Sequence, residues 1–156
     1  MSGMTPPCQI IARQSAKPIL EHVASNTLTG PRWANTTVLS GDLALIFTSA
    51  RDARDTDWSQ VVALYDQLVR LDSSPIIALN RAVAVAELDG PEVALAAVDR
   101  LEPRLAGYHA YHAARADLLC RLGRSQESRA AYSQAIELAG NTAETAYLTR
   151  RHDQLG

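Results

Sequence analysis

The chain has 156 residues, which suits one domain with a tail, and 47% of them are apolar, enough to form a buried core. Aromatic residues make up only 5%, so Ala, Leu and Val must build that core. The net charge of −2 argues against the basic surface that nucleic-acid-binding domains use. No apolar run approaches the ~20 residues of a membrane span, so no membrane contact is expected.

The cysteines and the N-terminus bear on the cellular compartment. Cys8 lies in an irregular stretch and Cys120 inside an expected helix, and this pair does not form a disulfide framework. The N-terminus also lacks the basic start and apolar stretch of a secretory signal. These features predict a reducing, cytoplasmic location.

Residues 1–50 differ in kind from the rest of the chain, and we call them the head. They contain few charged residues and several prolines, and no helical stripe lasts for three turns. Their most apolar stretch, TTVLSGDLALIFTS, is ambiguous between a strand and a buried helix. We expect a weakly structured head that is poorly ordered or folds back over the first helices.

From residue 52 the sequence turns helical, and residues 52–156 form the expected helical repeat domain. Thr56, Ser74 and Thr142 are the expected N-caps, with Pro75 in a first turn. A loop is expected from about Pro103 onward. Apolar periodicity predicts helices at residues 56–72, 75–89, 91–102, 108–122, 125–139 and 142–155.

These helices repeat as hairpins. Arg81 and Arg115 occupy equivalent places 34 residues apart, and the turn glycines Gly90 and Gly123 are 33 apart. A period of about 34 with two helices per unit is typical of tetratricopeptide (TPR) repeats. The expected fold is therefore all-α, a TPR-like antiparallel helical-hairpin solenoid, with the polar last helix as its end cap.

Three stretches carry a more specific resemblance: DTDW at residues 55–58, SPIIALNRAVAVAELDGP at 74–91 and YHAYHAARADLLCRLGR at 108–124. Residues 50–155 closely resemble the C-terminal TPR-like region of bacterial extracytoplasmic-function (ECF) sigma factors, which are sigma-70-family subunits of RNA polymerase. The resemblance implies a role in transcription initiation and its regulation. It also implies a protein partner, either RNA polymerase or the domains of a sigma factor.

The resemblance does not extend to promoter recognition. Sigma factors of this group carry two further domains, one for core polymerase and the −10 element and a helix-turn-helix domain for the −35 element. A 50-residue head cannot hold either, and it shows no helix-turn-helix pattern. We therefore expect a truncated form that does not bind DNA directly. The alternative is a stand-alone TPR-type adaptor with no polymerase role, whose partner is an unidentified regulator.

The candidate partner-binding residues are the two equivalent arginines and their polar neighbours, Asn80, Arg81, Arg115 and Asp117. Arg81 and Arg115 can face a partner's carboxylate from a groove lined by the 75–89 and 108–122 helices. They can equally pair with Asp or Glu of an adjacent helix inside the fold.

Other patterns favour structural roles. His109, His112 and Cys120 share one helix, but a zinc site needs a closed set of four ligands, so we interpret the histidines as packing residues. Residues 150 and 151, both arginine, suggest a solvated helix end. The sequence contains no phosphate loop and no nucleophile elbow, so we expect no enzyme, no catalytic residue, no metal and no cofactor.

Overall fold

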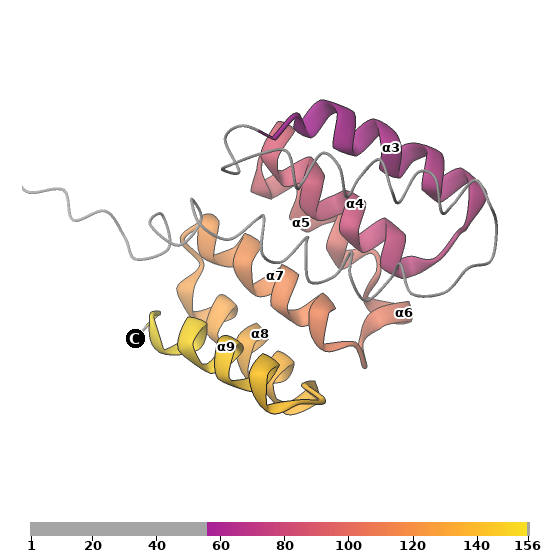
Figure 1. Cartoon of the computed structure of the whole chain (residues 1–156). Helices are drawn as coiled ribbons and strands as arrows, with labels where there is room; N and C mark the ends of the chain where they lie inside the picture. Colours follow the sequence, from indigo (N-terminus) through magenta and orange to yellow (C-terminus); the bar gives the residue numbers. More distant parts are fainter. Residues whose placement is uncertain (1–55, 156) are drawn as a thin grey trace, which may run out of the picture.

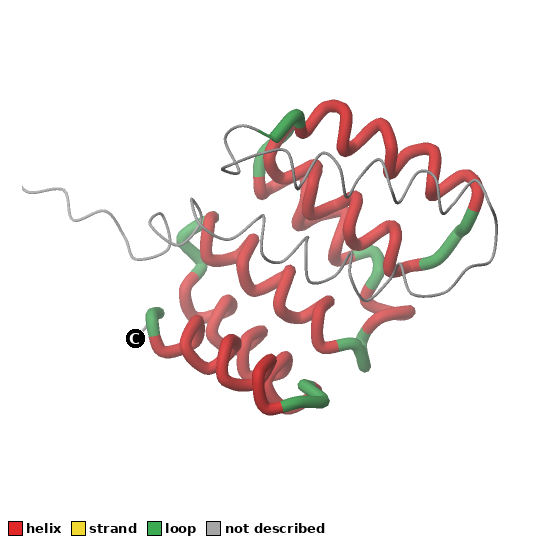
Figure 2. The backbone as a smooth tube through the Cα atoms, in the orientation of Figure 1, coloured by secondary structure: helices red, strands yellow, loops and turns green. Residues whose placement is uncertain are grey.

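The computed structural model describes residues 56–155, which form seven helices and no strand (Figures 1 and 2). The all-α prediction is confirmed for this part of the chain, and the head lies outside it. The helices are α3 (Trp58–Leu71), α4 (Pro75–Leu88), α5 (Pro91–Asp99), α6 (Glu102–Leu105), α7 (His109–Arg121), α8 (Ser125–Leu138) and α9 (Thr142–Asp153). None of these seven helices is long and apolar enough to cross a membrane.

The helices pack in chain order. α3 lies against α4, α4 against α5, α5 against α7, α7 against α8, and α8 against α9 (Figure 1). The short helix α6 connects α5 to α7 and touches α4. A single hydrophobic cluster runs from Val61 in α3 to Leu155 after α9, so the described residues share one core.

The helix starts follow local capping chemistry, with two corrections. The Ser74 hydroxyl accepts a hydrogen bond from the Ile76 amide at 3.3 Å, which confirms the expected cap of α4. Asp57 and Asn141, however, cap α3 and α9 in place of the threonines beside them. Asp and Asn are stronger N-cap residues than Thr, which explains why each cap lies one residue from the predicted position.

The connection after α5 is also more regular than predicted. α5 ends at Asp99, and α6 then forms a separate turn of helix where a loop was expected. Pro103 lies in the first turn of α6, where its missing N–H breaks no helical hydrogen bond. Leu105 is buried and holds this turn against the core.

The two turn glycines both have a positive φ, which residues with a side chain rarely adopt. Gly90 has φ of 93° and Gly123 has φ of 75°, and no other described residue has a positive φ. A Cβ on either glycine meets no atom within 4 Å. The backbone angle, rather than lack of space, therefore explains glycine at both turns.

α4 and α7 form the centre of the fold. In α7, every residue from 110 to 120 is buried except His112 and Arg115, and α4 is buried almost as completely. On α4, Leu79 and Val83 are buried and Ile76 is partly buried. Both helices are therefore largely buried.

Cys120 belongs to this central part of α7. Its side chain is 1% exposed and belongs to the hydrophobic core.

Candidate partner-binding residues and a buried ion network

Arg81 and Arg115 each pair with an aspartate of the preceding helix. The Arg81 Nε lies 2.5 Å from Oδ1 of Asp66 in α3, and the Arg115 Nε lies 2.8 Å from Oδ1 of Asp99 in α5. Arg81 and Arg115 keep 38% and 30% of their side chains exposed. The pairing inside the fold, one of the two arrangements expected from sequence, is therefore the one observed. Both arginines still reach the surface.

Asn80 and Asp117 lie in the interior, unlike the arginines beside them in sequence. Asn80 is 2% exposed and Asp117 is 4% exposed. Asn80 lies next to Tyr65 of α3, whose pKa is raised by burial. Of the four candidate residues, only the two arginines are therefore available to a partner at the surface.

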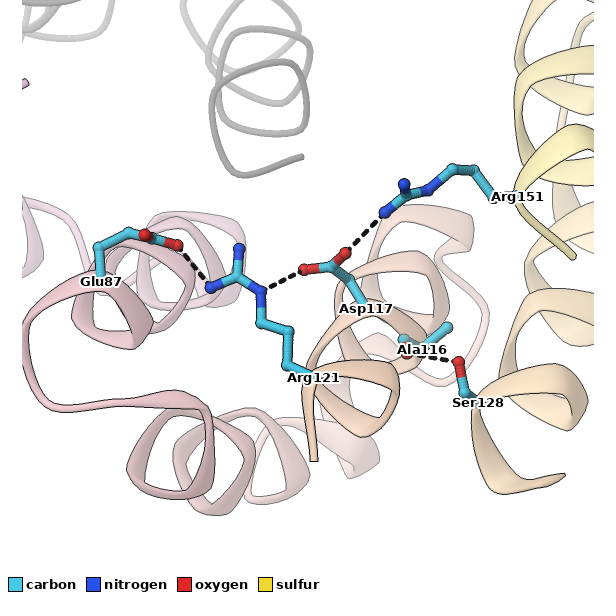
Figure 3. A network of polar contacts seen from close by, with 6 residues as sticks. All are labelled: Glu87, Ala116, Asp117, Arg121, Ser128 and Arg151. Atoms are coloured by element: carbon cyan, nitrogen blue, oxygen red, sulfur yellow. Dashed lines mark hydrogen bonds and ion pairs between the residues drawn. The ribbon is translucent and has the colours of Figure 1, made fainter. Parts of the chain in front are cut away.

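The Asp117 carboxylate is shared between two arginines (Figure 3). Its Oδ1 lies 2.7 Å from Nη2 of Arg151 in α9, and its Oδ2 lies 3.0 Å from Nε of Arg121 in α7. Arg121 Nη1 in turn lies 2.5 Å from Oε1 of Glu87 in α4. The result is a row of four alternating charges that joins α4, α7 and α9, which we call the ion network.

The ion network is electrically balanced and largely shielded from water. It holds two carboxylates and two guanidinium groups, and only the Glu87 side chain, at 21%, is more than about a tenth exposed. Burial lowers the pKa of Arg121, but Asp117 and Glu87 outweigh burial and raise that pKa above its ordinary value. The network therefore keeps Arg121 charged in the interior.

The network repeats with the period of the sequence. Glu87 and Arg121 are 34 residues apart, and so are Asp117 and Arg151. Each pair therefore joins equivalent positions of successive hairpins. Sequence reasoning missed this network and placed Arg151 at a solvated helix end, whereas Arg151 is 8% exposed and only Arg150 lies at the surface. Opposite charges 34 residues apart are the signal that would have found it.

A second buried polar contact ties α8 to α7. The Ser128 hydroxyl donates a hydrogen bond to the Ala116 carbonyl oxygen at 2.7 Å, and Ser128 is fully buried (Figure 3). Tyr132, one turn further along α8, has its pKa raised by burial and by the nearby charge of Asp117. The interior side of α8 is therefore fixed by polar contacts as well as by apolar packing.

The two histidines of α7 contact different elements. His112 Nε2 lies 2.7 Å from the Ala106 carbonyl oxygen, in the loop before α7. His109 Nε2 lies 3.4 Å from Glu144 Oε2 in the first turn of α9. Among residues 56–155, no three His, Cys, Asp or Glu side chains gather closely enough to hold a metal ion.

Comparison with known proteins gives a relative without an assigned function. The chain is 46% identical over 113 residues to the uncharacterized protein R00370 of Rhizobium meliloti (strain 1021). This match takes in 72% of the chain and 27% of the relative, so the chain spans about a quarter of the relative's length. No protein-family model matches the chain, and no solved structure matches it.

Proposed function

We propose that this chain is the C-terminal protein-interaction and regulatory region of an ECF-type sigma factor, in a form without promoter recognition. The proposal rests on the resemblance of residues 55–58, 74–91 and 108–124 to that region. Its role is then to bind RNA polymerase or sigma-factor domains in the cytoplasm and tune transcription initiation.

The observation that carries the TPR-like part of the proposal is the contact between residues 34 apart. In stacked repeats, each unit packs against its neighbour, so equivalent positions of successive units meet. Glu87–Arg121 and Asp117–Arg151 are two such contacts. The Arg81–Asp66 and Arg115–Asp99 pairs also recur at equivalent helix junctions. These regularities favour a TPR-like solenoid over an unrelated helical bundle.

The surface arginines give the proposal a contact site. The bonds to Asp66 and Asp99 use the Nε of each guanidinium. The guanidinium carries five donors, and its terminal nitrogens suit a bidentate contact with a partner's carboxylate. A partner carboxylate would therefore bind across the Arg81 and Arg115 edge of the array, while Asn80 and Asp117 support that edge from inside.

Binding to purified bacterial core RNA polymerase, and separately to isolated sigma-factor domains, tests this function. The Arg81→Glu/Arg115→Glu double variant is expected to weaken binding, whereas Arg129→Glu, on the exposed face of α8, is the control. Neither the chain nor its mixture with core polymerase should bind promoter DNA. Absence of binding to polymerase and to sigma domains would contradict the proposal and leave the stand-alone adaptor. Promoter-specific transcription would contradict the truncated form.

A further inference from the structure

The last helix is held by unusually few side chains. Of the twelve residues of α9, only Leu148 and Arg151 are buried, whereas nine residues of α7 are buried. A helix of twelve residues is marginal in water on its own, so the helicity of α9 depends on its docking. The structure thus combines a deeply buried central helix with a lightly attached end helix.

The attachment of α9 has a simple pattern. Glu144 contacts His109 of α7, Leu148 enters the core, and Arg151 reaches Asp117 of α7. These three residues occupy positions i, i+4 and i+7, so they lie along one face of the helix. α9 also packs along α8. The surface of α7 and α8 beneath α9, which we call the α9 slot, therefore accepts an acid, a leucine and an arginine in that order.

Removal of α9 leaves the rest of the ion network partly satisfied. Asp117 loses Arg151 but keeps Arg121, and Arg121 keeps Glu87. The connection from α8 to α9 is only residues 139–141, where Gly140 is exposed and a Cβ added to it would meet no atom within 4 Å. Of this connection only Ala139 packs against the core. The contacts of the three side chains, of α8 and of Leu155, which follows α9 and lies in the core, therefore decide whether α9 stays docked.

We propose that the α9 slot is a docking site for a helix of a partner protein, and that α9 occupies it in cis until the partner replaces it. The partner helix presents Glu, Leu and Arg at positions i, i+4 and i+7. This inference rests on the proposal that the region binds a protein, although it does not require that protein to be RNA polymerase.

The sparse burial of α9 favours a partner over a second copy of the chain. The α9 of a second copy offers the same three side chains, so it makes no better contacts than the α9 already in the slot. The α9 of the same chain also has the advantage of a high effective concentration, because its connection is short. A partner helix gains over α9 by adding apolar side chains on the same face. Thr145 marks such a position, since it is partly buried next to the face of Leu148.

A synthetic peptide of residues 141–155 carrying Thr145→Leu is the probe. Added to the full chain, it is expected to bind and to speed hydrogen exchange in α9, while the exchange of α4 and α7 stays unchanged. The same peptide with Arg151→Ala in addition is the matched control. Loss of its charge-assisted contact to Asp117 should weaken its binding by roughly tenfold or more. The altered residue distinguishes peptide fragments from chain fragments by mass.

Three results would overturn the inference. The first is α9 exchange that is unchanged at saturating peptide, and the second is equal binding of both peptides. The third is a concentration-dependent dimer of the chain alone that exchanges α9, because the occupant would then be a second copy. Displacement of α9 by the peptide, without binding of the chain to polymerase or to sigma-factor domains, would refute the proposed function and keep the slot. Binding to either of them without displacement of α9 by the peptide would refute the slot and keep the proposed function.

Discussion

Replacing Asp117 with alanine removes the carboxylate that two buried arginines share. Asp117 accepts from Arg151 at 2.7 Å and pairs with Arg121 at 3.0 Å, and its side chain is 6% exposed. In the variant, Arg121 retains Glu87, but Arg151 loses its carboxylate partner while its own side chain stays 9% exposed. The variant therefore leaves a buried positive charge poorly compensated.

The expected cost follows from this burial. Breaking a buried ion pair by removing one partner costs about 3–5 kcal/mol, because the remaining charge is left desolvated. Asp117→Asn keeps the shape and one acceptor, so we expect it to cost less, about 2 kcal/mol. The control is Arg81→Ala, since the Arg81–Asp66 pair also joins two helices but is 38% and 41% exposed. An exposed pair of this kind contributes at most about 1 kcal/mol.

Urea unfolding of the full chain, followed by circular dichroism, gives the free energy of unfolding of all three variants, and thermal unfolding gives their Tm. For a domain of this size, a loss of 1 kcal/mol lowers the Tm by about 4–8 °C, so Asp117→Ala should lower the Tm by about 12 °C or more. A loss below about 1 kcal/mol for Asp117→Ala, or a loss equal to that of Arg81→Ala, would refute the reasoning. The network would then add nothing beyond the apolar core.

Three further changes test separate features. Gly123→Val should lower the free energy of unfolding by about 1–2 kcal/mol because φ at this glycine is 75°. Gly140→Val, where φ is not positive, should lower it less. An equal Tm for the wild type and Gly123→Val would contradict this reasoning. Ser128→Ala should lower the free energy of unfolding by about 1 kcal/mol, because it removes the hydrogen bond to the Ala116 carbonyl. The control Ser133→Ala removes an exposed hydrogen bond and should change it less in the same urea unfolding measurement. Burial raises the pKa of Tyr132 above its usual 10.0, so the unfolded chain loses this proton first and stability should fall as the pH rises past 10. Tyr132→Phe should flatten that fall, and an unchanged slope of unfolding free energy against pH would count against it.

Local chemistry predicted the helices of the described chain well. The cap at Ser74, Pro75 in the first turn of α4 and the glycine turns at Gly90 and Gly123 are signals read within a few residues of sequence, and the structure confirms each of them. The α3 and α9 caps were wrong by a single residue because neighbouring side chains share the same capping chemistry. α6 was missed because four residues give too short a period to detect.

The candidate site was only half visible in the sequence. The equivalence of Arg81 and Arg115 follows from the 34-residue spacing alone, but their partners lie 15 and 16 residues earlier on other helices. No local signal decides whether such an arginine faces a partner or an aspartate of the fold. Packing of α3 on α4 and of α5 on α7 made that choice.

The sequence by itself determined the helical class, the positions of the turns and the period of the repeat, because capping, backbone angle and apolar spacing act over short range. Tertiary structure alone decided which charges are buried. Arg150 and Arg151 are neighbours with the same chemistry, yet one is exposed and the other enters the ion network. Their fates differ because α9 docks with one face toward Asp117, and that contact joins residues 34 apart that only the tertiary structure brings together.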